Sequence, residues 1–128
     1  ATLIKKISAF SELTSHHTPK VIINKNEEAI YFSRTPIPFQ RDHEMERWMD
    51  NHSYFKHIGI YGYRKAALEE ITKLPVSSLE QAEALEQLRW IENGFKIKTA
   101  QTDLESLSID TPEDLERALF LINNSSQL

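Results

Sequence analysis

Short apolar runs separated by polar stretches recur along the chain and predict a set of β-strands. The runs at residues 21–23 and 29–32 flank the polar stretch 24–28, a pattern typical of a β-hairpin. Residues 54–64 (YFKHIGIYGYR) are rich in β-branched and aromatic side chains and predict a largely buried strand. The stretch 95–102 (FKIKTAQT) predicts a further strand with alternating faces.

Helical periodicity and helix-start signals occur between and after these strands. Helices are expected over residues 45–52, 64–74, 79–93 and 111–122. The signals are clearest for 79–93, where Ser77 and Glu80 form a capping box and Gly94 supplies a C-terminal stop. Strands that alternate with helices predict one domain of α/β or α+β layer architecture over residues 1–128.

Composition and charge exclude several classes of protein. A chain of 128 residues with 40% hydrophobic residues has enough apolar side chains for one core. The net charge of −4 comes from segments of mixed sign, without the Lys/Arg stripe that binds nucleic acid. The chain has no cysteine, and no apolar run approaches the roughly 20 residues of a membrane span. We expect a soluble, cytoplasmic protein without nucleic-acid or membrane partners. Because the chain starts with ATLIKKI rather than with Met, we also expect a fragment of a longer protein or a processed chain.

A carboxylate falls on the apolar face of the predicted helix 79–93. On a helical wheel Leu79, Ala82 and Leu85 mark one apolar arc, and Glu86 lies within it, three residues before Arg89. Burying a charge is costly unless it is paired or binds something. Glu86 therefore either forms a salt bridge with Arg89 at the edge of the core or lines a cleft.

The predicted strand 54–64 places His57, Gly59 and Tyr61 on one of its faces. Glycine leaves room above a sheet for a polar ligand, although a hydrogen-bonded core histidine beside a packed tyrosine explains the same pattern. Arg34 ends the second strand of the hairpin, where it can bind a carboxylate or phosphate or remain solvated. The other histidines have no recurring ligand spacing, so a zinc site is not expected.

Asp110 stands one residue before Thr111, the predicted cap of the last helix. It is either an ordinary helix-start residue or a ligand for a hard cation such as Mg²⁺, which binds one or two carboxylates together with substrate phosphates.

Four motifs extend this picture: YFSRTPIPFQRD, YFKHIGIYGYR, SSLEQAEALEQLRWIENG and SIDTPEDLERA. In this order they resemble the C-terminal half of the 3-deoxy-manno-octulosonate (Kdo) cytidylyltransferases, also called CMP-Kdo synthetases. The resemblance covers nearly the whole chain and implies part of a three-layer α/β/α fold of the nucleotide-diphospho-sugar transferase type. It also implies transfer of CMP from CTP to Kdo with release of pyrophosphate, a need for Mg²⁺, a homodimer and a place in lipopolysaccharide synthesis.

The resemblance further implies which residues form the site. The Kdo pocket would be lined by Arg34, His57, Tyr61, Glu86 and Gln87, and Asp110 would hold Mg²⁺. The N-terminal half of the family, with its nucleotide-binding loop and a QGDEP-like metal motif, has no counterpart here, and the chain's 3 glycines form no phosphate loop. We therefore expect the parent protein to be a cytidylyltransferase and the isolated chain not to turn over CTP. Two alternatives remain open: a transferase for another sugar acid such as sialic acid, and a non-catalytic dimerisation or sugar-acid-binding module.

Overall fold

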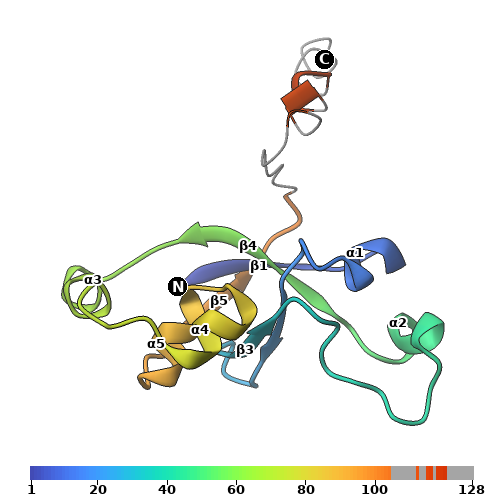
Figure 1. Ribbon diagram of the computed structural model, residues 1–128. Helices are drawn as coiled ribbons and strands as arrows, with labels where there is room; N and C mark the ends of the chain where they lie inside the picture. Colours follow the sequence, from blue (N-terminus) through green and yellow to red (C-terminus); the bar gives the residue numbers. More distant parts are fainter. Residues whose placement is uncertain (105–111, 113–114, 117, 121–128) are drawn as a thin grey trace.

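A five-stranded mixed sheet organises the molecule (Figure 1). The computed structural model describes residues 1–104, 112, 115–116 and 118–120. Within them the strands are β1 (Thr2–Lys6), β2 (Lys20–Ile23), β3 (Ala29–Ser33), β4 (Phe55–Tyr61) and β5 (Thr99–Gln101), in the sheet order β3-β2-β4-β1-β5. β1 runs parallel to β5 and antiparallel to β4, while β2 lies antiparallel to both β3 and β4. Helices pack on this sheet, so the predicted α/β class is confirmed.

The predicted hairpin is confirmed as β2 and β3, with Val21 opposite Phe32. Its turn is closed by Asn24, whose side-chain oxygen accepts the backbone N–H groups of Asn26 at 2.8 Å and Glu28 at 3.0 Å. Asparagine favours such turns because its short side chain reaches the backbone two residues further on.

The helices within residues 1–104 are short. They are α1 (Phe10–Thr14), the 3₁₀ helix η1 (Met45–Arg47), α2 (Trp48–Asn51), α3 (Lys65–Ile71), α4 (Ser78–Glu83) and α5 (Gln87–Glu92). The predicted helices 45–52 and 64–74 are confirmed by η1 with α2 and by α3. Of the predicted helix 111–122, the described residues 112, 115–116 and 118–120 are helical, and Asp110 lies outside the described residues.

The prediction of one continuous helix over 79–93 is wrong. Ala84 adopts the left-handed conformation, with φ 51° and ψ 49°, and separates α4 from α5. Leu85 donates its backbone N–H to the Glu80 carbonyl, which ends α4, and Leu85 and Leu88 then turn into the core. The helical wheel that placed Glu86 on a buried face therefore does not apply, because it assumed an unbroken helix.

Two clusters of buried apolar side chains hold the elements together. The main cluster consists of Ile4, Val21, Phe32, Ile71, Leu85, Leu88, Trp90 and Ile97. The second cluster consists of Ile7, Leu13, Trp48 and Tyr54. In Figure 1, α3, α4 and α5 lie toward one end of the sheet, and α1 and α2 lie toward the other. Each cluster thus joins its own set of helices to the sheet.

Strand β4 changes character along its length. Ile58 is 5% exposed, whereas Ile60 is 57% exposed, so the prediction of a largely buried strand holds only for its first part. Within the described part of the chain, no helix has the length and apolar character needed to cross a membrane.

Candidate functional site

His57 lies on β4 and is held by β1. Its Nε2 lies 2.9 Å from the Thr2 hydroxyl, and that hydroxyl lies 2.8 Å from the Ile60 carbonyl. Because the hydroxyl has one proton and the carbonyl can only accept, we assign the proton between the two side chains to Nε2. Burial lowers the pKa of His57 to about 4, so the ring is neutral near pH 7 and its Nδ1 is a hydrogen-bond acceptor.

Tyr61 lies on the same face of β4 as His57, as predicted. The two ring centroids are 5.2 Å apart, and the Tyr61 ring also contacts Trp90 at 5.1 Å and Tyr63 at 5.8 Å. The Tyr61 hydroxyl is buried and has no hydrogen-bond partner among the described residues. Burial, with smaller contributions from Tyr63 and Glu86, holds the pKa of Tyr61 far above its usual value. The hydroxyl is therefore a protonated donor that finds no acceptor in the described part of the chain.

Gln87 and Glu86 stand at the start of α5. Gln87 is 6% exposed, and its Nε2 is a second buried atom without a hydrogen-bond partner in the described residues. Glu86 is exposed, so it does not lie on a buried helix face; that it lines a cleft stays a prediction. Its charge contributes, after burial, to the raised pKa values of Tyr61 and Tyr63.

The predicted pairing of Glu86 with Arg89 is also wrong. Arg89 binds Glu80 instead, with its Nε and Nη2 each 2.6 Å from a carboxylate oxygen. This fork is possible because the break at Ala84 brings the first turn of α4 next to α5. The hydrogen bonds from Arg89 lower the pKa of Glu80, although burial opposes the shift.

Arg34 follows β3 and holds the end of α4. Its guanidinium donates to the carbonyls of Glu83 at 2.7 Å, Ala84 at 3.0 Å and His16 at 3.0 Å. A guanidinium has five N–H donors, so two remain without a partner in the described part of the chain. The structure thus fixes the plane of Arg34 and leaves part of its hydrogen-bonding capacity for a ligand.

The structure brings some of the five residues predicted to line the sugar-acid pocket into contact with one another, and links the others only indirectly. His57 and Tyr61 are in direct contact, and Glu86 acts on Tyr61 through its charge. Arg34 does not contact them directly. Its guanidinium donates to the carbonyl of Ala84, which lies two residues before Glu86 in the chain. The room expected above Gly59 is present, since a Cβ there would meet no atom within 4 Å.

Sequence reasoning missed three residues that support this site: Thr2, Lys20 and Glu83. Thr2 fixes the His57 ring. Lys20 is 0% exposed, and Glu83 accepts the backbone N–H of Arg34 at 2.9 Å. A Lys at the start of a strand and a Glu in a helix carry no signal of burial, because such residues are usually solvated.

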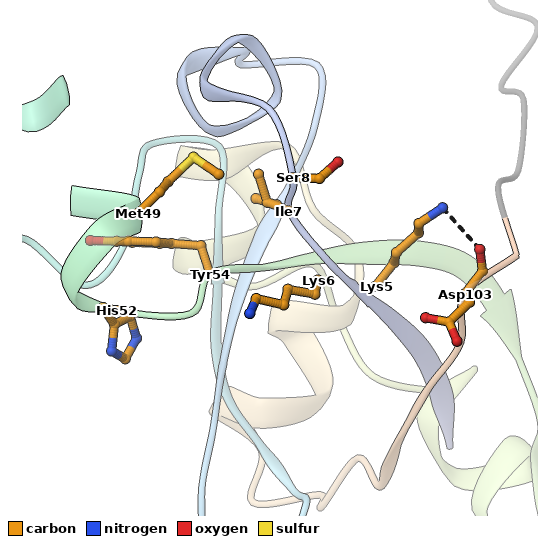
Figure 2. A pocket seen from close by; sticks show the side chains of 8 residues that line it. All are labelled: Lys5, Lys6, Ile7, Ser8, Met49, His52, Tyr54 and Asp103. Atoms are coloured by element: carbon orange, nitrogen blue, oxygen red, sulfur yellow. Dashed lines mark hydrogen bonds between the residues drawn. The ribbon is translucent and has the colours of Figure 1, made fainter. Parts of the chain in front are cut away.

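A separate cavity of about 420 Å³ lies at the ends of β1 and β4 (Figure 2). Its lining is Lys5, Lys6, Ile7, Ser8, Met49, His52, Tyr54 and Asp103. Figure 2 shows the Lys5 ammonium directed at the Asp103 carbonyl, 3.0 Å away. The five residues predicted to line the sugar-acid pocket, all of them described, do not line this cavity. Among the described residues, no three His, Asp or Glu side chains form a metal-binding group.

Comparison with known proteins places this arrangement in a family. A sequence profile of the family described as Cytidylyltransferase matches residues 1–99. A 3-deoxy-manno-octulosonate cytidylyltransferase of Bacteroides thetaiotaomicron is 54% identical over 129 residues, which cover 98% of this chain and 52% of the relative. The corresponding relative from Cytophaga hutchinsonii is 56% identical over 118 residues, covering 91% of this chain and 47% of the relative. The chain therefore belongs to the cytidylyltransferase family.

A solved structure agrees with this assignment. The CMP:2-keto-3-deoxy-manno-octonic acid synthetase complexed with CTP matches with a TM-score of 0.85 at 39% identity, over 97% of this chain and 48% of that one. The fold is thus that of about half of the synthetase, as the motifs predicted. The chain likewise spans about half the length of the curated relatives it matches.

Proposed function

We propose that the protein to which this chain belongs transfers CMP from CTP to Kdo, and that this chain supplies the sugar-acid part of the site. In that reaction the anomeric hydroxyl oxygen of Kdo bonds to the α-phosphorus of CTP, pyrophosphate leaves, and the hydroxyl proton passes to solvent. The names of the relatives support this assignment. The observation that carries it is that the Tyr61 hydroxyl and the Gln87 amide nitrogen, two of the three buried side-chain atoms without a hydrogen-bond partner in the described residues, lie in this part of the chain.

Unpartnered buried polar groups are costly, and a ligand that pairs with them recovers that cost. A sugar presents several hydroxyls, each of which both donates and accepts a hydrogen bond. The Tyr61 hydroxyl and the Gln87 amide would donate to such hydroxyls, and the neutral His57 Nδ1 would accept from one. Glu86, exposed beside Tyr61, would accept from another.

Arg34 would bind the carboxylate of the sugar acid. Its guanidinium is already fixed by three carbonyls, so little side-chain entropy is lost when its two remaining N–H groups meet a ligand. A planar guanidinium also matches a carboxylate in geometry and charge. This arrangement favours an acidic sugar over a neutral one.

Asp110 would hold Mg²⁺, and this part of the proposal rests on the sequence alone. When bound, the ion would neutralise charge on the triphosphate, while the residues of this chain hold the sugar acid in place. We further propose that the parent protein acts as a homodimer in the cytoplasm and serves lipopolysaccharide synthesis. The isolated chain is expected to release no pyrophosphate from CTP, because it matches only about half of its relatives.

An NMR titration of the ¹⁵N-labelled chain with Kdo tests the site directly. We expect the side-chain signals of Gln87 and Arg34 to shift with saturation. Gln87→Ala should weaken binding about 3- to 10-fold, the value of one or two hydrogen bonds, whereas Gln81→Ala on the exposed part of α4 should not. Kdo that shifts no signal up to tens of millimolar would contradict the proposal. Competition with sialic acid separates the two acceptors.

A pyrophosphate-release assay with CTP, Kdo and Mg²⁺ tests the second part. Turnover by the 128-residue chain alone would show that it contains a complete nucleotide site and would overturn the expectation of inactivity.

A further inference from the structure

Lys20 is a buried lysine with every donor in use. It is 0% exposed, and its ammonium donates to the carbonyl oxygens of Ser15 at 2.7 Å, Thr18 at 2.6 Å and Arg34 at 2.6 Å. Lysines are almost never fully buried without a partner, because removing the charge from water is costly. Burial lowers the pKa of Lys20 to about 8, so the ammonium form prevails at neutral pH. The three carbonyls belong to two segments, which the ammonium ties together.

Glu83 binds the same segment of the chain, Ser33 and Arg34, through its carboxylate. One carboxylate oxygen accepts the Ser33 hydroxyl at 2.7 Å, and the other accepts the Arg34 backbone N–H at 2.9 Å. The Arg34 guanidinium in turn holds the carbonyls of Glu83 and Ala84. Arg34 is thus fixed at its carbonyl by Lys20, at its N–H by Glu83 and at its side chain by the end of α4.

We propose that Lys20 is a positioning residue of the sugar-acid site and acts through Arg34. Its charge also gives the Lys20–Arg34–Glu83 cluster one net positive charge, which attracts the carboxylate of the substrate. The cluster contains two cations and one anion, so an acidic ligand on Arg34 balances it. Lys20 itself has no donor left for a ligand and does not touch the substrate. This inference rests on the proposed function, because it needs a sugar acid at Arg34.

The neighbouring lysine shows what a purely structural buried lysine looks like in this sheet. Lys56 on β4 pairs with Lys20 across the strands and is 7% exposed. Its ammonium lies 2.5 Å from a carboxylate oxygen of Glu12 on α1, so this pair supplies its own counter-charge. Lys56 is therefore a matched control. Replacing either lysine by Met removes a buried ammonium, but Lys56 binds Glu12 whereas Lys20 binds the Arg34 carbonyl.

The test measures the affinity of the chain for Kdo and for its uncharged methyl ester in the Lys20→Met and Lys56→Met variants. Lys20→Met should weaken Kdo binding at least 10-fold and reduce the preference for the acid over the ester. Lys56→Met, if folded, should keep both values within about twofold. A folded Lys20→Met variant that binds Kdo as the unmodified chain does, with the same preference, would overturn the inference while leaving the proposed function intact.

A milder variant covers the case in which Lys20→Met does not fold. Ser33→Ala removes one hydrogen bond to Glu83 and no charge, and it should weaken Kdo binding about 3-fold. Unchanged affinity in Ser33→Ala would then overturn the inference. Failure of the unmodified chain to bind Kdo would overturn the proposed function and this inference with it.

Discussion

Acid should destabilise the fold through His57. The native pKa of His57 is about 4 because the ring is buried, against 6.5 for an exposed histidine. Between these pH values the unfolded chain binds more protons than the native chain, so the free energy of unfolding falls as the pH falls. The full difference corresponds to about 3 kcal/mol, and about 2 kcal/mol of it is lost between pH 7 and pH 5.

Urea unfolding followed by circular dichroism at pH 7, 6 and 5 measures this loss. The His57→Asn variant should lose about 2 kcal/mol less than the unmodified chain over this range, whatever its stability at pH 7. His17→Asn, which alters an exposed histidine, should keep the full dependence. Arg89 lowers the pKa of Glu80 from 4.5, so the stability that this ion pair contributes is lost mainly below pH 4.5. It therefore changes little between pH 7 and pH 5, where the effect of His57 is measured. Equal pH dependence in His57→Asn and the unmodified chain would refute the reasoning.

Three further substitutions test the packing and the site. Tyr61→Phe should leave the melting temperature unchanged or raise stability by up to about 1 kcal/mol, because it removes an unpartnered hydroxyl, while Kdo affinity in the NMR titration falls. Leu88→Ala, in the main cluster, should cost about 2–5 kcal/mol in urea unfolding, whereas Leu104→Ala at a site 78% exposed should change stability by less than about 0.5 kcal/mol. Ala84→Gly should raise stability by roughly 0.5–1 kcal/mol, and a lower melting temperature would mean that the left-handed conformation is not strained.

Local patterns predicted the elements whose causes are local. The hairpin of β2 and β3 follows from two apolar runs and from Asn24, which closes the turn between them. The start of α4 follows from the capping box of Ser77 and Glu80, and the end of α5 from Gly94, whose φ of 82° suits glycine.

Elements that depend on distant parts of the chain were not predictable in this way. β1 forms because it pairs with β4 and β5, which lie about 50 or more residues away in the sequence. The break at Ala84 contradicts good local helix propensity and is held by Arg34, 50 residues earlier. Sequence periodicity contains no information about either contact.

The candidate site shows the same division. The alternation of β4 correctly placed His57 and Tyr61 together, because a strand fixes its own two faces. The predicted burial of Glu86 was wrong, because the helical wheel assumed a continuous helix and the folded chain interrupts that helix at Ala84. Lys20 was missed for a related reason: the carbonyls of Ser15 and Thr18 are near it in the sequence, but the Arg34 carbonyl, which completes its hydrogen bonds, reaches it only in the folded hairpin.

The two hydrophobic clusters divide the chain's two tryptophans between them. Trp90 belongs to the main cluster and Trp48 to the second cluster, and both are nearly inaccessible to water. Each cluster therefore contains one tryptophan. In the variants Trp48→Phe and Trp90→Phe the emission of the remaining tryptophan, excited at a wavelength that tyrosine does not absorb, can be measured alone. Coincident emission changes during denaturation would identify a single cooperative unit, and separate midpoints would identify two. Because each cluster contains one tryptophan, the cooperativity of unfolding can be measured from intrinsic fluorescence without an added label.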